Sequence, residues 1–286
     1  MLHKRIVVCL VAYDGRLATR ARFRDLGDPA DPAQVAARYE AEGADEVLLV
    51  DGSGNGGGPF LDLVRRTAQR LFIPLSVAGG FEDLDTVAAA LRAGADRVSL
   101  NTAAVEHPEL ISMVVQRFGS ASVTVGIDAK VERRRGEMSS DQAVEGVLDE
   151  QLEDLDWYRV FTHHGRTATS RNAVAWAEQC AQLGCGEIRV NSIDRDSIRE
   201  GYDLELTARI VERVNVPVMA SGGAGDASHM RDAFVIAGAD AALAGPMFHD
   251  GAVRILDVKR ELDAVGVPVR LPPLRDSRPE AAPPIP

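Results

Sequence analysis

The heptapeptide PLSVAGG at residues 74–80 returns later in the chain as PVMASGG at residues 217–223. Two further stretches return in the same order: GADEV at 43–47 matches GCGEI at 184–188, and the GAD at 94–96 matches the GAD at 238–240. These stretches join short β-branched runs to helical patterns, so the repeated unit is a strand followed by a helix. Repetition of such units in two halves predicts an α/β fold, a (β/α)8 TIM barrel built from two half-barrel repeats.

The two halves differ where their first strands end. The run at residues 5–10 should correspond to the run at 123–127, and both are rich in apolar residues. The later run is followed by Asp128, a carboxylate at the C-terminal end of a strand, where barrel enzymes place their catalytic groups. The earlier run is followed by Val11. The repeat therefore indicates where a second acid could stand, and valine occupies that position.

Strand–helix units can be followed along most of the chain. The periodicity predicts strands at residues 5–11, 46–51, 74–78, 97–101, 122–128, 187–192, 217–221 and 241–245. It predicts helices at about 33–43, 59–71, 84–93, 107–118, 172–184, 203–213, 227–237 and 253–264.

Two segments fall outside the repeat, which otherwise fills a single barrel domain over residues 1–270. Residues 131–157 form an insertion that leaves the C-terminal end of a strand, on the face where barrel chemistry occurs. Part of it has apolar residues at helical spacing, and a lid or a partner contact competes with a solvated insertion as its role. Residues 271–286 are rich in proline and are expected to form a disordered tail.

Composition excludes several classes of protein. The chain has 286 residues, 45% hydrophobic and 26% charged, which is ordinary for a globular domain. Its net charge of −11 argues against a nucleic-acid or membrane surface. We expect a cytoplasmic protein, because no signal peptide or long apolar run is present and the three cysteines show neither paired spacing nor an even count. Neither a metal nor a cofactor is predicted.

Glycines cluster just beyond two strand ends related by the repeat. The pair Gly79-Gly80, with Asn101 and Thr102 after the next strand, could present N–H and side-chain donors to an anion. Glycine pairs also occur simply because tight turns need them. The corresponding second site has Gly222, Gly223 and Gly245, but Pro246 there has no N–H to donate. The sequence predicts one complete phosphate site and one impaired site.

Four carboxylates lie at the ends of predicted strands or just beyond them: Asp51, Asp128, Asp194 and Asp196. Each could act on a substrate, and each could instead cap a helix or organise its own loop. Asp128 is the strongest acid–base candidate because it follows an apolar run. The pair His163-His164 has no third ligand at a usual spacing, so a zinc site is not favoured.

Four charged residues lie at the opposite ends of the strands. Arg5, Glu46, Arg97 and Glu187 begin predicted strands, which places them at the bottom of the barrel. Alternating charges there can form a ring of ion pairs across the barrel axis. Such a ring can stabilise the barrel or act as a gate, and both interpretations stay open.

Together these motifs resemble the cyclase subunit family of imidazole glycerol phosphate synthase, over nearly the full length except residues 131–157 and the tail. The resemblance is carried by KRI at 4–6, DGR at 14–16, GG at 79–80, NTAAV at 101–105, IDAK at 127–130, SIDRD at 192–196, GYD at 201–203, ASGGAG at 220–225 and FH at 248–249.

The resemblance implies a ribulose-phosphate-binding barrel, an activity and a partner. In this family a glutaminase subunit docks on the bottom face, and ammonia crosses a gate and travels up the barrel. It reaches a phosphorylated small-molecule substrate, a ribulosyl aminoimidazole carboxamide nucleotide, and the products are imidazole glycerol phosphate and an aminoimidazole carboxamide ribotide. The resemblance implies a catalytic role for Asp128, an ammonia gate of Arg5, Glu46, Arg97 and Glu187, and substrate or phosphate contacts by Asp51, Gly80, Asn101, Thr102, Asp194, Asp196, Gly222, Gly223 and Gly245.

The chain departs from the family pattern at the end where the chemistry occurs. Val11 stands in place of the first of two paired aspartates that act as acid and base, and Thr19 in place of a lysine. Ser197-Ile198 and Pro246 alter the second phosphate site, and His164 replaces a glycine. Losing a general acid or base usually lowers a rate by about 10²–10⁴.

These departures favour a diverged cyclase that takes ammonia from a glutaminase and acts on another phosphorylated substrate. The ordinary cyclase reaction of histidine biosynthesis is the first alternative, with Tyr13 or Asp14 compensating for Val11. A non-catalytic ammonia conduit or scaffold that activates a partner is the second, and a sugar isomerase on the same half-barrel plan is a weaker third.

Overall fold

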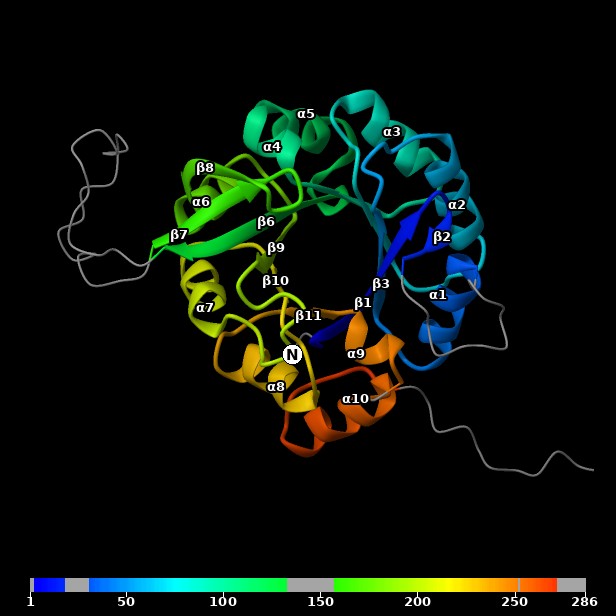
Figure 1. The fold of residues 1–286 in the computed structure, drawn as a ribbon, viewed down its shortest axis with the longest axis vertical. Coiled ribbons are helices and arrows are strands. Elements are labelled where there is room, and N and C mark those ends of the chain that lie inside the picture. Colours follow the sequence, from blue (N-terminus) through cyan, green and yellow to red (C-terminus); the bar gives the residue numbers. More distant parts are fainter. Residues whose placement is uncertain (1–2, 19–30, 133–156, 252, 272–286) are drawn as a thin grey trace, which may run out of the picture.

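Eight parallel strands close into a barrel in the computed structural model, which describes residues 3–18, 31–132, 157–251 and 253–271. Hydrogen-bonded neighbours follow the order β5-β4-β3-β1-β11-β10-β9-β6, and β5 pairs with β6 to complete the circle. Figure 1 shows these strands around a common centre with helices outside them. The predicted TIM barrel is confirmed. The barrel strands are β1 (Arg5–Tyr13), β3 (Glu46–Asp51), β4 (Leu75–Ala78), β5 (Arg97–Leu100), β6 (Val123–Glu132), β9 (Glu187–Ser192), β10 (Val218–Ser221) and β11 (Ala241–Ala244).

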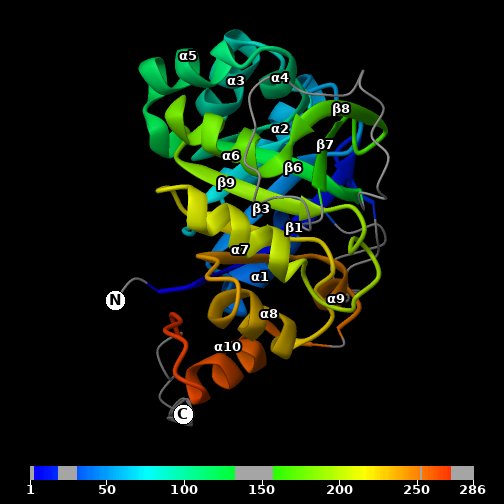
Figure 2. The same ribbon diagram turned by 90° about the vertical axis from the view of Figure 1, so that its left-hand side faces the viewer.

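Helices follow the strands and cover the outside of the barrel, as the side view in Figure 2 also shows. Their starts have local causes: the Asp83 side chain accepts from the Thr86 backbone N–H in a capping box, and Asp31 caps the helix that begins with Pro32. The helices are α1 (Pro32–Ala41), α2 (Gly58–Ala68), α3 (Leu84–Arg92), α4 (Thr102–Glu106), α5 (Glu109–Phe118), α6 (Ala173–Gln182), α7 (Leu204–Arg213), α8 (Ala227–Val235), α9 (Pro246–His249) and α10 (Ile255–Ala264).

The structure differs from the predicted elements in three places. The helix predicted at 107–118 begins at Glu109, after Pro108, and the short helix α4 that precedes it was not predicted. Strand β6 runs on to Glu132 and pairs antiparallel with β7 (Trp157–Thr162), which pairs with β8 (Thr167–Asn172). Residues 131, 132 and 157 of the predicted insertion therefore belong to strands, and its remainder, 133–156, lies outside the described residues, as do 272–286 of the predicted tail. The short strand β2 (Arg16–Leu17) and helix α9 were not predicted.

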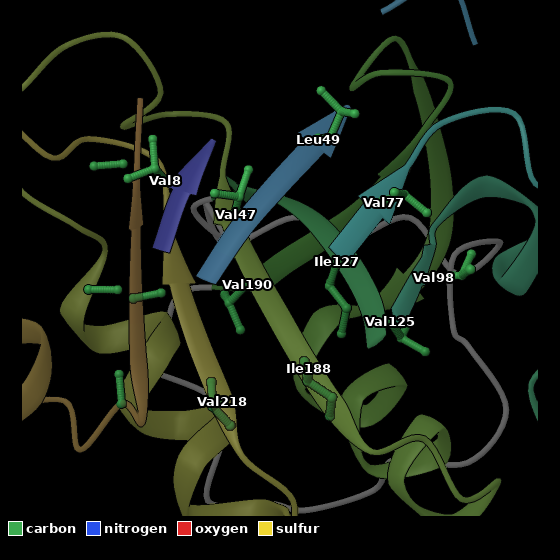
Figure 3. Close-up of a cluster of buried hydrophobic side chains, with 14 of the residues drawn as sticks. Val8, Val47, Leu49, Val77, Val98, Val125, Ile127, Ile188, Val190 and Val218 are labelled. Carbon is green, nitrogen blue, oxygen red and sulfur yellow. The ribbon is translucent and has the colours of Figure 1, made fainter. Parts of the chain in front are cut away.

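Side chains of the strands alternate between two separate cores. Val8, Val47, Leu49, Ile127 and their neighbours are fully buried in the layer between the strands and the helices (Figure 3). The residues between them point into the barrel, where a second cluster contains Val7, Leu48, Ala78, Met219, Ala241 and Leu243.

Repeated glycines occupy equivalent turns, with φ of +100° and +73° at Gly79 and Gly80 and +86° and +103° at Gly222 and Gly223. These positive values explain why both copies of the repeat keep glycine there.

A buried ion pair joins α10 to the bottom of the barrel. Lys259 is fully buried, and its Nζ donates to Asp45 Oδ1 at 2.7 Å and to the Arg270 carbonyl at 2.8 Å. The other oxygen of Asp45 accepts from the backbone N–H of Ile6 at 2.9 Å. Burial lowers the pKa of Lys259, and Asp45 opposes that shift.

We expect Asp45→Ala to lower the free energy of unfolding by about 3–5 kcal/mol, because it leaves the Lys259 ammonium buried without its counter-ion. Urea unfolding measures this change. The control is Asp257→Ala, which removes a pair with Arg260 on the exposed side of the same helix, 3.4 Å apart. Exposed pairs contribute about 0–1 kcal/mol, so equal losses in the two variants would contradict the role given to Asp45.

Candidate functional site

Asp128 lies at the C-terminal side of the barrel, held between two amides. It accepts from Asn101 Nδ2 at 2.9 Å and from Asn191 Nδ2 at 3.1 Å. Asn101 follows β5 and Asn191 lies on β9, so the two strands that flank β6 orient its carboxylate. Ser221, on β10, donates to the Asn191 amide oxygen at 3.1 Å and fixes the way that amide points. The network spans four adjacent strands.

Sequence reasoning placed Asp128 and Asn101 in the site but missed Asn191 and Ser221. Asn191 is the next-to-last residue of β9 and Ser221 is the last residue of β10. Both lie on the inward face of their strands, with the residues of the barrel interior. Strand alternation was the signal that could have found them, since Asn191 follows the inward-facing Glu187 by an even number of residues. The Asn101 amide oxygen is buried and has no hydrogen-bond partner among the described residues, so an acceptor stands beside Asp128.

The wall that carries Val11 is apolar. Val11 lies on β1 opposite Val50 of β3 and shares the inward face with Val7 and Cys9. Its own side chain is partly exposed. Thr19, predicted to replace a lysine of the first loop, lies outside the described residues. The polar network around Asp128 therefore has no acidic counterpart at position 11 of β1.

The first glycine site is a close contact between backbone segments. A Cβ added at Gly80 would lie 2.2 Å from the backbone nitrogen of Gly56, so the loop after β3 packs directly on this turn. Asp51 holds that loop: its carboxylate accepts from the backbone N–H groups of Ser53, Asn55 and Gly56, at 3.0, 3.2 and 2.9 Å, and from the Ser53 hydroxyl. In this arrangement Asp51 organises its own loop, and its contact with a substrate stays a prediction.

Gly80→Ala is expected to raise the KM for a phosphorylated substrate strongly, because the added methyl group must push the 51–56 loop away from the turn. Gly119→Ala is the matched control: Gly119 has a similar positive φ of +87°, but an added Cβ there meets nothing within 4 Å. Both variants carry the same kind of backbone strain. Steady-state kinetics on both should show the KM effect for Gly80→Ala alone, and a similar rise in Gly119→Ala would assign it to strain.

The β7–β8 turn reaches over the first site. The Thr102 hydroxyl oxygen accepts from the backbone N–H of His163 at 2.9 Å, and His163 and His164 both have positive φ. The His164 Nε2 atom would lie 3.4 Å from a Cβ added at Gly54, in the loop that Asp51 holds. The two histidines, for which the sequence did not favour a zinc site, are exposed and lie at the rim of this site.

The second glycine site is organised differently. A Cβ at Gly223 would lie 2.2 Å from the Gly201 carbonyl oxygen, and Gly222 packs on the backbone of Ser192. Gly245 precedes α9, and Pro246 is the first residue of that helix, a position that proline favours but where it offers no N–H. Asp194 accepts from the Val131 backbone N–H at 2.7 Å, whereas Asp196 is exposed.

The four charges at the bottom of the barrel form a closed ring. Arg5 donates to both Glu46, at 2.6 Å, and Glu187, and Arg97 donates to the same two residues at 3.2 and 3.3 Å. The carboxylate side chains are only 1% and 3% exposed, and the guanidinium groups cover them from the bottom face. Burial raises the pKa of Glu187, and Arg5 opposes this. The predicted ion-pair ring is present, while its role as a gate stays a prediction.

In the ranges that the structure describes, no group of three or more potential ligands could hold a metal ion. Over the same ranges, no helix is long and apolar enough to cross a bilayer.

Comparison with known proteins identifies the family. The family model described as "Histidine biosynthesis protein" matches residues 5–254. A protein of Myxococcus xanthus is 46% identical over 272 residues, covering 94% of this chain and 99% of its own length. One of Methanopyrus kandleri is 46% identical over 274 residues, covering 94% and 98%. One of Acidobacterium capsulatum is 44% identical over 274 residues, covering 95% and 100%. All three are named "Imidazole glycerol phosphate synthase subunit HisF".

Proposed function

We propose, from the premise that this chain belongs to the histidine biosynthesis protein family, that it is the cyclase subunit of an imidazole glycerol phosphate synthase and performs the ordinary cyclase reaction. The curated relatives with this name cover nearly the whole chain at 44–46% identity. They make the chain an enzyme of the lyase type, and they support the ordinary reaction better than the altered substrate that Val11 suggested. Its substrate is then a ribulosyl aminoimidazole carboxamide nucleotide.

The observation that carries the proposal is the position of Asp128. Its carboxylate is oriented by Asn101 and Asn191 at the C-terminal end of the strands, the face on which barrel enzymes carry their active sites. Addition of ammonia to the ketone of a ribulosyl group moves protons from nitrogen to the departing oxygen. A carboxylate within reach of both atoms can carry those protons as general base and then general acid.

The bottom ring and the barrel interior suit a supply of ammonia from below. The ring has two guanidinium and two carboxylate groups, so its net charge is zero and it presents no single-sign barrier. Its outer face is the surface on which a glutaminase subunit would dock. One wall of the interior above it is apolar, formed by Val7, Leu48, Met219 and their neighbours, which would keep released ammonia from dissolving into bulk water.

Turnover of the nucleotide substrate with free ammonium, and without any partner, tests this function. Turnover clearly above that of the same solution without protein would establish the reaction. A rate within about tenfold of an ordinary cyclase would also show that Val11 is compensated, whereas a rate about 10²–10⁴ lower would show that the missing acid limits it. No detectable turnover, with the chain folded and inorganic phosphate still bound at the first glycine site, would overturn it.

One specific observation favours a second candidate function. Valine at position 11 can neither donate nor accept a proton, and the wall around it is apolar. A diverged cyclase, using Asp128 alone on a different phosphorylated acceptor, would have no need of the second acid. Turnover of other ketose phosphates with ammonium, in the absence of turnover on the nucleotide, would support this candidate.

A further inference from the structure

The ring of His164 crosses the opening of the first glycine site. Its turn joins β7 to β8, which continue the sheet from β6, the neighbour of β5. On the β5 side the backbone N–H of His163 donates to the Thr102 hydroxyl oxygen at 2.9 Å. On the other side the His164 Nε2 atom would lie 3.4 Å from a Cβ added at Gly54, in the loop after β3. Gly80, which follows β4, lies between these two contacts, because β4 pairs with both β3 and β5.

The backbone of the turn holds the ring in this position. The φ angles of His163, His164 and Gly165 are +52°, +59° and +75°, in the left-handed region that residues with side chains rarely adopt. The N–H of Arg166 donates to the Thr162 carbonyl at 3.0 Å and closes the turn. The family pattern has glycine at position 164, the residue that such a backbone favours. A histidine there carries strain, and strained residues cluster at sites that bind or transform a ligand.

The nitrogens of the His164 ring are available to a ligand. Among the residues that the structure describes, this ring makes no hydrogen bond or ion pair, whereas the His163 ring lies 3.8 Å from Glu106. The carboxylate of the loop beneath it, Asp51, already accepts from three backbone N–H groups and from the Ser53 hydroxyl. His164 therefore presents a free donor at the mouth of the first glycine site.

We propose that His164 is a phosphate-binding residue particular to this chain, which donates its Nε2–H to an outer oxygen of a phosphate group at the first glycine site. The phosphate group rests on the proposed function, whereas the choice of residue rests on the contacts of the turn with both sides of the site. Thr102 fits the same arrangement, because its oxygen accepts from His163 and its own hydroxyl proton stays free for the anion. The predicted donors of the glycine turn and Thr102 would hold the phosphate from below, and His164 from above.

This contact is made to a group that the proposed reaction does not change. The phosphate passes from substrate to product intact, so its hydrogen bond to His164 is equally strong before and during the chemical step. Interactions of that kind lower KM and leave kcat unchanged. His164 would then set how strongly the chain prefers a phosphorylated substrate, and it would take no part in proton transfer.

Binding of inorganic phosphate tests the residue without any turnover. In chain labelled with ¹⁵N-glycine, the Gly80 amide signal, assigned by its loss in Gly80→Ala, reports on the first site. We expect the Kd measured from this signal to rise about tenfold in His164→Gly and in His164→Phe, as for one lost hydrogen bond to a charged group. Glycine suits this backbone, so misfolding cannot explain the loss, and phenylalanine keeps a ring without its N–H. The control, His107→Ala, removes an exposed histidine that lies 3.4 Å from Glu109, and it should leave the Kd unchanged.

Each other result of the titration contradicts a different part of the proposal. An unchanged Kd in both His164 variants would overturn it altogether. Full affinity in His164→Phe alone would show that the ring only covers the anion, and would overturn the hydrogen bond. A Gly80 signal that ignores phosphate in the unsubstituted chain would overturn the site. The proposed function fails by a separate result, the absence of nucleotide turnover, which leaves a positive phosphate titration intact.

Steady-state kinetics with the nucleotide substrate add a second readout. His164→Gly should raise KM about tenfold and keep kcat within about twofold, because the lost contact is the same in the ground state and the transition state. A fall in kcat at unchanged KM would contradict a role confined to binding the phosphate.

Discussion

Asp128→Asn is expected to lower turnover of the nucleotide substrate with free ammonium by about 10²–10⁴, the usual loss when a general acid or base is removed. The amide has nearly the shape of the carboxylate, so the fold and the substrate site should be preserved. It cannot accept and return a proton, and one of its ends would present N–H groups to a donor amide of Asn101 or Asn191. The loss should appear in kcat, with KM changed much less.

The control for this variant is Asp85→Asn, which makes the same substitution at an exposed position in the first turn of α3. It should keep full turnover. Thermal unfolding of both variants separates a chemical defect from a folding defect. If Asp128→Asn retained turnover within about threefold of the unsubstituted chain, the general acid–base role of Asp128 would be wrong, since such roles rarely contribute so little.

The fold could be predicted because the same strand–helix pattern occurs in both halves of the sequence. Each repeated segment couples a buried strand to a glycine turn, and the barrel strands lie within a few residues of their predicted bounds. The β7–β8 hairpin was missed because its sequence is not repeated in the first half of the chain, so no second occurrence was available for comparison. Helix α4 was not predicted because its five residues are too few to show helical periodicity, and the predicted helix after it began two residues early, before Pro108.

The site was less predictable than the fold, and the reason is geometric. A sequence shows which carboxylates follow strands but not which atoms occupy their lone pairs. Asp51 and Asp194 resemble Asp128 in position, yet backbone N–H groups of nearby loops and strands occupy both. Asp128 is the one of the three that side-chain amides hold at the end of the barrel. Arg189 belongs to no recognisable sequence motif. Its position beside Gly126, on the neighbouring strand β6, follows only from the strand register.

Val11→Asp is expected to raise turnover of the nucleotide substrate, and the increase could reach about 10²–10⁴ if the new carboxylate takes up half of the proton transfers. Position 11 lies on the inward face of β1 and is partly exposed, so a charge can be placed there without full burial. Val11→Asn is the matched control, because it has the shape and polarity of aspartate without its proton chemistry. A gain confined to Val11→Asp would mean that the chain still binds the ordinary substrate and that one missing acid limits its rate. Equal rates in the two variants would mean that position 11 no longer meets the reacting atoms, and that result would favour the diverged cyclase over the ordinary one.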